Sequence, residues 1–122
     1  MILIAEDDQD IRTVLIEMLE GLGHTTIAFA DAESAVQFLN SGGIDDISII
    51  ASDFILPGAN GLELIKYARN LRSNIPCFII SGYATQNIPS GVHYLKKPFQ
   101  LRQLKEIVTK CRQQLTESSL TY

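Results

Sequence analysis

The chain has 122 residues, close to the commonest length of a single domain, and its 46% of hydrophobic residues suffices for one core rather than two. A net charge of −4 and a pI near 5.0 argue against direct binding to nucleic acid, which needs a basic face, so we expect protein partners. No run approaches the roughly 20 apolar residues of a membrane span, and no basic leader precedes the first apolar run, so we expect no membrane contact and a cytoplasmic location.

Strand and helix patterns alternate from the start of the chain. Residues 1–5 are continuously apolar, as in a short strand that is covered on both faces. Apolar residues then repeat at helical spacing from Ile11 to Leu22, and Gly23 favours the end of that helix. Residues 25–29 are β-branched and aromatic, which predicts a second strand.

The middle of the chain repeats this alternation. Asp31 can cap a helix over residues 32–39, and Ser-Gly-Gly at 41–43 predicts its end. An apolar run over residues 47–52 predicts the third strand, and residues 62–71 predict the third helix.

The last third holds two more strands, over residues 77–81 and 93–96, and a final amphipathic helix over 101–115. Cys77 and Cys111 lie on apolar stripes without metal-like spacing, so we interpret both as core residues.

This order of elements predicts the α/β class. Strands that alternate with helices imply right-handed crossovers and a parallel sheet with helices on both faces. We expect one domain over residues 1–122, with its core in about 1–115 and a loose tail over 116–122. Ligands of such sheets bind outside the carboxyl ends of the strands, where the strand order reverses.

Acidic residues end two of the predicted strands. Glu6 and Asp7 follow the first strand and Asp53 ends the third, so the three carboxylates converge if those strands are neighbours. Close carboxylates repel one another unless a cation lies between them, and Mg²⁺, or Mn²⁺ in its place, prefers such oxygen ligands. The backbone carbonyl of Ile55 can supply a further oxygen. The alternative is that such acids cap helices or face solvent, which for Asp53 alone is about as probable.

Other polar residues follow the same strand-end pattern. Asp8 or Asp10 is best interpreted as the cap of the first helix. Ser81 ends the fourth strand, and Lys97 follows the fifth and precedes Pro98, which favours an extended Lys97. Each alone is weak evidence, since a lysine before proline is usually a solvated turn residue. The order of acids, Asp53, hydroxyl and lysine on successive strands carries more weight.

Together these motifs resemble the receiver domain of two-component response regulators over nearly the whole chain. The resemblance rests on Ile4-Ala5-Glu6-Asp7-Asp8, Ser52-Asp53 with Pro57 and Gly61, Ser81, and Lys97-Pro98-Phe99. It implies a doubly wound, flavodoxin-like sheet of five parallel strands in the order 2-1-3-4-5. It also implies a phosphorylation-dependent signalling switch rather than an enzyme that acts on a small substrate.

The resemblance also implies roles for individual residues. Asp53 would be the phosphoacceptor, and Glu6, Asp7, Asp53 and the carbonyl of Ile55 would hold Mg²⁺. Ser81 would hydrogen-bond the phosphoryl group, and Lys97 would pair with it.

Tyr94 matches the family's aromatic switch position, although it can equally be an ordinary strand aromatic. The donor would be a phosphohistidine on a sensor histidine kinase or histidine phosphotransfer protein. The output would go to a downstream protein or to an effector domain outside this chain.

Some positions depart from the family pattern. Ser52 puts a hydroxyl where an apolar residue is usual, and a buried hydroxyl needs a partner. Gly82 replaces a common alanine and can loosen the loop after Ser81. Residues 82–92 are too few for a normal fourth helix and contain Pro89, so we expect a mobile loop of at most one turn.

Two other interpretations compete with the phosphorylated switch. The first is a degenerate receiver that binds a partner without phosphorylation, against which the intact acid, hydroxyl and lysine set argues. The second is a phosphohydrolase with an aspartate nucleophile, but Ile55 stands where such enzymes commonly carry a second acid.

Overall fold

The chain folds around one parallel sheet. The computed structural model describes residues 1–82 and 88–120. The sheet has five strands in the order β2-β1-β3-β6-β7, with the bounds β1 (Ile2–Ala5), β2 (Thr26–Phe29), β3 (Ile49–Asp53), β6 (Cys77–Ser81) and β7 (Val92–Lys96). Counted in chain order, these strands have the expected arrangement 2-1-3-4-5, so the predicted fold class is confirmed.

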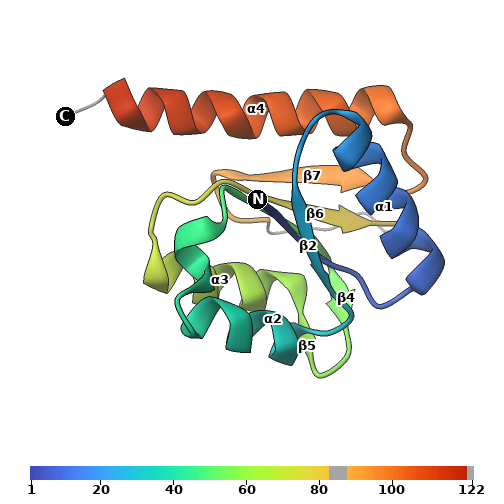
Figure 1. Ribbon diagram of the computed structural model, residues 1–122, viewed down its shortest axis with the longest axis horizontal. Helices are drawn as coiled ribbons and strands as arrows, with labels where there is room; N and C mark the ends of the chain where they lie inside the picture. The colour runs from blue at the N-terminus through green and yellow to red at the C-terminus, as the bar shows by residue number, and fades with distance from the viewer. Residues whose placement is uncertain (83–87, 121–122) are drawn as a thin grey trace.

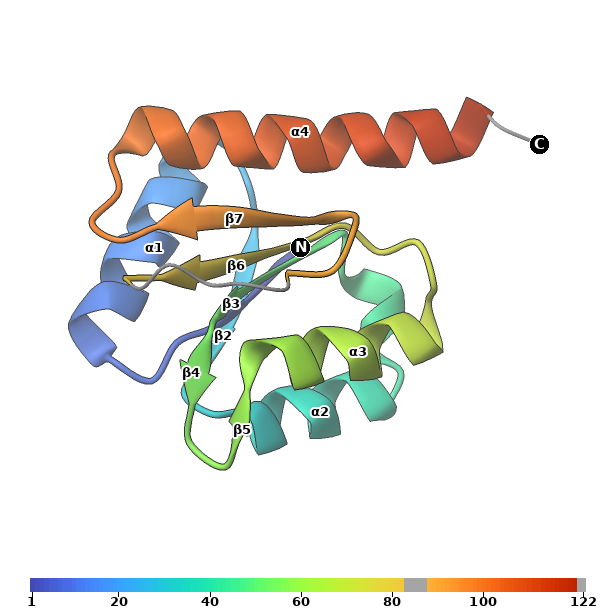
Figure 2. The same ribbon diagram turned by 180° about the vertical axis from the view of Figure 1, so that it is seen from behind.

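Helices cover both faces of the sheet. Helices α1 (Gln9–Gly21) and α4 (Leu101–Leu120) lie on one side, and α2 (Ala32–Asn40) and α3 (Gly61–Leu71) lie on the other (Figures 1 and 2). Alternate residues of each strand therefore enter different cores, as the pleat requires. In β1, for example, Ile2 and Ile4 pack with α1 and α4, whereas Leu3 and Ala5 pack with α2 and α3.

The two cysteines belong to these cores. Cys77 packs beside α3, Cys111 lies on the buried face of α4, and both thiols are free and fully buried. Burial raises the pKa of Cys77 to about 11 and that of Cys111 to about 12, which keeps both sulfurs as neutral thiols. Their interpretation as core residues is confirmed.

Polar residues cap three helices. The carboxylate of Asp8 accepts a hydrogen bond from Ile11 N at 3.0 Å, and Asp31 accepts one from Ser34 N at 2.7 Å. The bond from the Ser34 backbone lowers the pKa of Asp31. Asn60 caps α3 in the same way. The structure thus places Asp8, and not Asp10, at the cap of α1.

Three short features were not predicted. Strands β4 (Ile55–Leu56) and β5 (Ala59–Asn60) form an antiparallel hairpin directly after Asp53, and a 3-10 helix spans Gly43–Asp46. The signal for the hairpin is Pro57-Gly58, because Gly58 has a positive φ of 79° in the turn. Helix α4 also runs five residues past its predicted end at Leu115, since no Gly or Pro interrupts residues 116–120.

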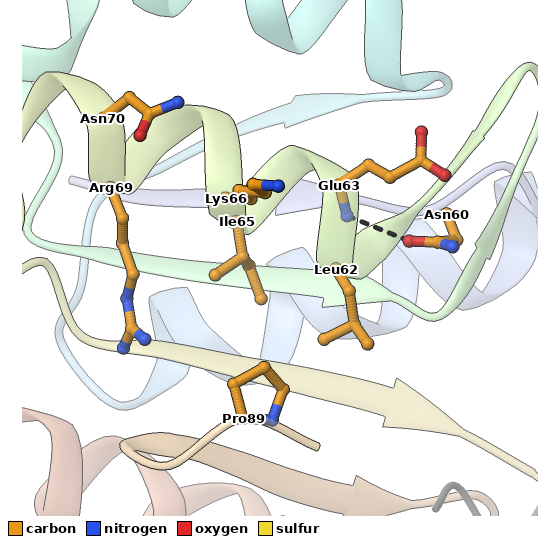
Figure 3. Close-up of a pocket in the computed structure, with 8 residues that line it drawn as sticks. All are labelled: Asn60, Leu62, Glu63, Ile65, Lys66, Arg69, Asn70 and Pro89. Carbon is orange, nitrogen blue, oxygen red and sulfur yellow. Dashed lines mark hydrogen bonds between the residues drawn. The ribbon is translucent and has the colours of Figure 1, made fainter. Parts of the chain in front are cut away.

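The connection between β6 and β7 borders a groove on α3. None of its described residues, 82 and 88–91, is helical, and the rest of the expected mobile loop, 83–87, lies outside the described residues. The groove has a volume of about 380 Å³ and lies between α3 and Pro89. Figure 3 shows Leu62, Ile65 and Arg69 pointing from α3 toward Pro89, and Arg69 donates to the carbonyl of Gly91 at 3.1 Å.

Candidate functional site

Three carboxylates meet at the carboxyl edge of the sheet. Strands β1 and β3 are neighbours, with Ala5 opposite Ser52, so the residues that follow them emerge side by side. Oxygen atoms of Glu6, Asp7 and Asp53 all lie within 4.8 Å of one another. The structure thus brings together the three acids that the sequence places at strand ends.

Lys97 is the cation of this cluster. It follows β7, and its Nζ lies 2.9 Å from Glu6 Oε1 and 3.2 Å from Asp53 Oδ1. Both ion pairs found in the described part of the chain are therefore made by this one lysine. The Lys97–Pro98 peptide bond is cis. Glu6 is only 1% exposed and Asp53 8%, so one half-buried ammonium faces two almost buried carboxylates.

The pKa values in the cluster reflect this crowding. Burial, followed by the neighbouring Asp53, raises the pKa of Glu6 above its usual range, and the opposing effect of Lys97 does not cancel the rise. Burial alone would lower the pKa of Lys97, but its contacts with Glu6 and Asp53 outweigh burial and raise it. Lys97 therefore stays protonated, and this one ammonium lies beside a cluster of three carboxyl groups.

The backbone and its neighbours orient Asp53. Phe54 N donates to Asp53 Oδ1 at 3.1 Å, which fixes one carboxylate oxygen. Ser52, fully buried, donates from its Oγ to the carbonyl of Asp53 at 2.9 Å, so the expected partner of this hydroxyl is present. A Cβ on Gly61 would collide with the Asp53 carbonyl and lie 2.8 Å from Ser52 Oγ. Only glycine lets α3 begin this close to Asp53.

Ser81 and Tyr94 lie on the two strands beyond β3. Ser81 ends β6, is 3% exposed, and is paired in register with Lys96 on β7. Tyr94 is half-buried on β7, and its hydroxyl donates to the Ser81 carbonyl at 3.2 Å. The two residues assigned to switching are thus in direct contact, while their roles remain predictions.

Two further residues border the acids. Ile55 lies two residues beyond Asp53 with its side chain 60% exposed, and the role of its carbonyl as a ligand stays a prediction. Arg12 on α1 was missed by the sequence analysis, although its Nη1 donates to the carbonyl of Glu6 at 2.8 Å. The available signal was its charge, because a cation in the first turn of a helix opposes the helix dipole.

The donor set fits a hard divalent cation. All three side chains offer carboxylate oxygens, and no sulfur or imidazole accompanies them in the cluster. Mg²⁺ and Mn²⁺ prefer oxygen ligands, and repulsion among the acids favours a bound cation.

This fold and this cluster agree with comparisons to known proteins. The family model for the response regulator receiver domain matches residues 2–109. The chain therefore belongs to the family of response regulator receiver domains, the phosphorylation-linked signalling modules of two-component systems.

Individual relatives sharpen that assignment. The chain is 30% identical to the response regulator receiver protein CpdR of Brucella abortus, with 89% of this chain and 93% of CpdR covered. It is 33% identical to the transcriptional regulator NtrC of Azospirillum brasilense over 88% of this chain but only 23% of NtrC. Some relatives therefore consist almost wholly of this domain, whereas in others it is a small part.

A solved structure supports the same family. The receiver domain of the hybrid histidine kinase CckA is 33% identical and superposes with a TM-score of 0.78, covering 90% of this chain and 96% of that one. No helix in the described part of the chain is long and apolar enough to cross a membrane.

Proposed function

We propose that this domain is a phosphorylatable switch that accepts a phosphoryl group on Asp53. The observation that carries the proposal is the cluster itself, in which Glu6, Asp7 and Asp53 converge and Lys97 contacts two of them. Residues 1–115 would act as one receiver core. The donor would be a phosphohistidine on a sensor histidine kinase or histidine phosphotransfer protein in the cytoplasm.

The chemistry needs positioning and charge neutralisation more than proton transfer. Asp53 Oδ1 is engaged by Phe54 N and Lys97, so we assign the attack on phosphorus to Oδ2. A new P–O bond forms to Asp53 as the P–N bond of the phosphohistidine breaks, and the electron pair leaves on the imidazole. Lys97 moves its ammonium from the carboxylates to the transferred oxygens. Glu6, Asp7, Asp53 and the Ile55 carbonyl would hold Mg²⁺, which would supply the remaining charge neutralisation.

The response follows from the contacts of Ser81. Its hydroxyl would turn toward the new phosphoryl oxygens, which are strong hydrogen-bond acceptors. Because Tyr94 donates to the carbonyl of the same residue, a displacement of Ser81 changes the environment of the Tyr94 ring. Phosphorylation is thereby linked to the surface around β7, where a downstream protein would bind.

The exposed Ile55 supports a switch over a phosphohydrolase. It occupies the position two residues after Asp53 and carries no group that can donate a proton to a leaving group. Hydrolysis of the phosphorylated Asp53 would then be slow and limited to attack by water.

Intact mass spectrometry tests this proposal. Incubation with Mg²⁺ and a small phosphodonor such as acetyl phosphate should add one phosphoryl group per chain, which mild base should remove because an acyl phosphate is labile. Asp53→Asn, which is nearly isosteric, should abolish the addition. Equal labelling of both proteins, or addition that persists without divalent metal, would refute the proposal.

A further inference from the structure

The turn between β1 and α1 carries Glu6 and Asp7, the acids proposed to bind metal. Beyond the amide of Glu6, its backbone groups no longer pair with a neighbouring strand. Glu6 N still pairs with Phe29 O at 3.0 Å, so the ladder reaches the amide of Glu6. The Glu6 carbonyl follows the last residue of the strand, and Arg12 supplies it with a donor. Arg12 Nη1 lies 2.8 Å from that carbonyl and 3.4 Å from the carbonyl of Asp7.

Arg12 occupies an unfavourable place for a cation. It lies near the amino end of α1, where the helix dipole favours negative charge, and Asp8 and Asp10 supply that charge. Arg12 is half-buried, and its guanidinium reaches back over the turn to these carbonyls. Hydrogen bonds to the two carbonyls compensate for this unfavourable position. A guanidinium can make both, because it is planar and carries several donors.

The turn has further anchors at both ends. Asp8 caps Ile11, and Arg12 N pairs with Asp8 O at 2.9 Å, which binds the end of the turn to the helix. Asp8 N lies 3.3 Å from Glu6 Oε2, which restrains the Glu6 side chain itself. With the bonds from Arg12 to the carbonyls of Glu6 and Asp7, the peptide groups that carry both acids are held against the start of α1.

We propose that Arg12 is a positioning residue for the metal site, acting through the carbonyls of Glu6 and Asp7 rather than on the metal. The inference rests on the proposed function, because it assumes that these acids bind Mg²⁺. A turn that is already held in place loses little conformational entropy when the cation binds. Anchoring by Arg12 therefore raises the affinity for Mg²⁺. Supporting contacts of this kind typically change metal affinity by about 10- to 100-fold.

The sign of the effect separates positioning from simple electrostatics. A guanidinium beside the site repels a divalent cation, so removing an electrostatic bystander would tighten Mg²⁺ binding. Removing a positioning residue would weaken it. Arg12→Met keeps most of the apolar stem and loses all donors, whereas Arg12→Lys keeps the charge but offers a single, shorter-reaching ammonium.

The test is calorimetric titration of the metal-free protein with MgCl₂, because the chain has no tryptophan to report binding. We expect the Mg²⁺ Kd to rise about tenfold in Arg12→Met and by less in Arg12→Lys. Arg72→Met is the matched control, since Arg72 also donates to backbone carbonyls, those of Ile44 and Ile47, at the opposite end of the sheet. Its Kd should equal that of wild type.

A second readout does not depend on metal. Amide hydrogen exchange at Asp7 and Asp8 should be faster in metal-free Arg12→Met than in wild type, while exchange in β3 stays unchanged. If Arg12→Met does not fold, Arg12→Lys carries the test.

The outcomes are distinguishable. Wild-type protein that binds no Mg²⁺ and accepts no phosphoryl group would refute the proposed function and this inference together. Wild-type binding with an unchanged or lower Kd in Arg12→Met would overturn the inference alone. A Kd that rises equally in Arg12→Met and Arg72→Met would also overturn it, because the effect would then be general loss of stability.

Discussion

The two ends of the sheet differ in what their cationic side chains contact. At the amino end, cationic groups bond to backbone carbonyls: Arg72 donates to Ile44 and Ile47, and the amino group of Met1 donates to Asp46 at 2.9 Å. At the carboxyl end, Arg12 also donates to backbone carbonyls, those of Glu6 and Asp7, but Lys97 faces two carboxylates. The contacts of Arg72 and Met1 pair each donor with a neutral acceptor, whereas Lys97 is one ammonium beside three carboxyl groups.

This difference separates a structural polar cluster from a functional one. Neutral carbonyls are satisfied by one good donor, so the amino end has no reason to recruit a ligand. Three close carboxyl groups share one ammonium, and an additional cation relieves the repulsion among carboxylates at such short range. The unequal number of carboxyl groups and ammonium groups distinguishes the carboxyl end, which is the end that we propose to be functional.

The largest effect should come from filling the space at Gly61. Gly61→Ala places a methyl group against the carbonyl of Asp53, and backbone atoms there cannot move aside. We expect a loss of about 3 kcal/mol in unfolding free energy, as for severe overpacking. Urea denaturation measures it, and Gly21→Ala, where nothing lies within 4 Å of the added Cβ, is the control. If Gly61→Ala lowers the unfolding free energy no more than Gly21→Ala does, the backbone around Asp53 is less rigid than described.

The next effect tests the amino end. Arg72→Met removes donors from two carbonyls and should cost about 2 kcal/mol, since hydrogen bonds from charged groups are worth roughly 1.5–3 kcal/mol. The rise in melting temperature produced by Mg²⁺ should stay the same as in wild type. An altered response to Mg²⁺ would mean that the two ends are not independent.

Lys97→Met should have a smaller effect on stability but a qualitatively different one. Without metal, the acids lose their counter-ion, so the melting temperature should fall. The unfolding free energy should drop by about 1–2 kcal/mol. With Mg²⁺ the stabilisation should exceed that of wild type, because the metal no longer competes with an ammonium. Thermal melts over a Mg²⁺ series measure both. A smaller Mg²⁺ response than in wild type would contradict the competition.

The smallest effect concerns His24, after α1. Burial, then the nearby Arg112 and the amino terminus, lowers the pKa of His24 below its usual 6.5. The unfolded chain therefore binds a proton first, so stability should fall as pH drops below about 6.5 and level off below the folded pKa. After solvent screening we expect less than about 0.5 kcal/mol. In His24→Gln, the unfolding free energy measured in thermal melts between pH 5 and 8 should depend less on pH than in wild type. An unchanged pH dependence would exclude His24 as its source.

The sequence predicts the sheet and the acids well because both follow from local patterns. Buried parallel strands are short apolar runs, and the residue after such a run necessarily lies at the sheet edge, which locates Glu6 and Asp53. Asp8 was correctly interpreted as a possible cap, although only the structure distinguishes it from Asp10.

Features that depend on contacts across the fold were not predictable in the same way. No local pattern shows that Arg12 turns back to the Glu6 carbonyl or that Lys97 divides its contacts between Glu6 and Asp53. The hairpin of β4 and β5 was missed for another reason. Its strands have two residues each, which is too short for an alternating pattern to be recognised.

The close approach of Gly61 to Asp53 has a consequence for how this sequence can evolve. A conflict between two side chains can be relieved by shrinking either one, so such positions drift in compensating pairs. The nearest obstacle at position 61 is a backbone carbonyl, which every residue at position 53 would carry. No substitution elsewhere in the chain removes that atom. Descendants of this chain that keep the same start of α3 must therefore keep glycine at position 61.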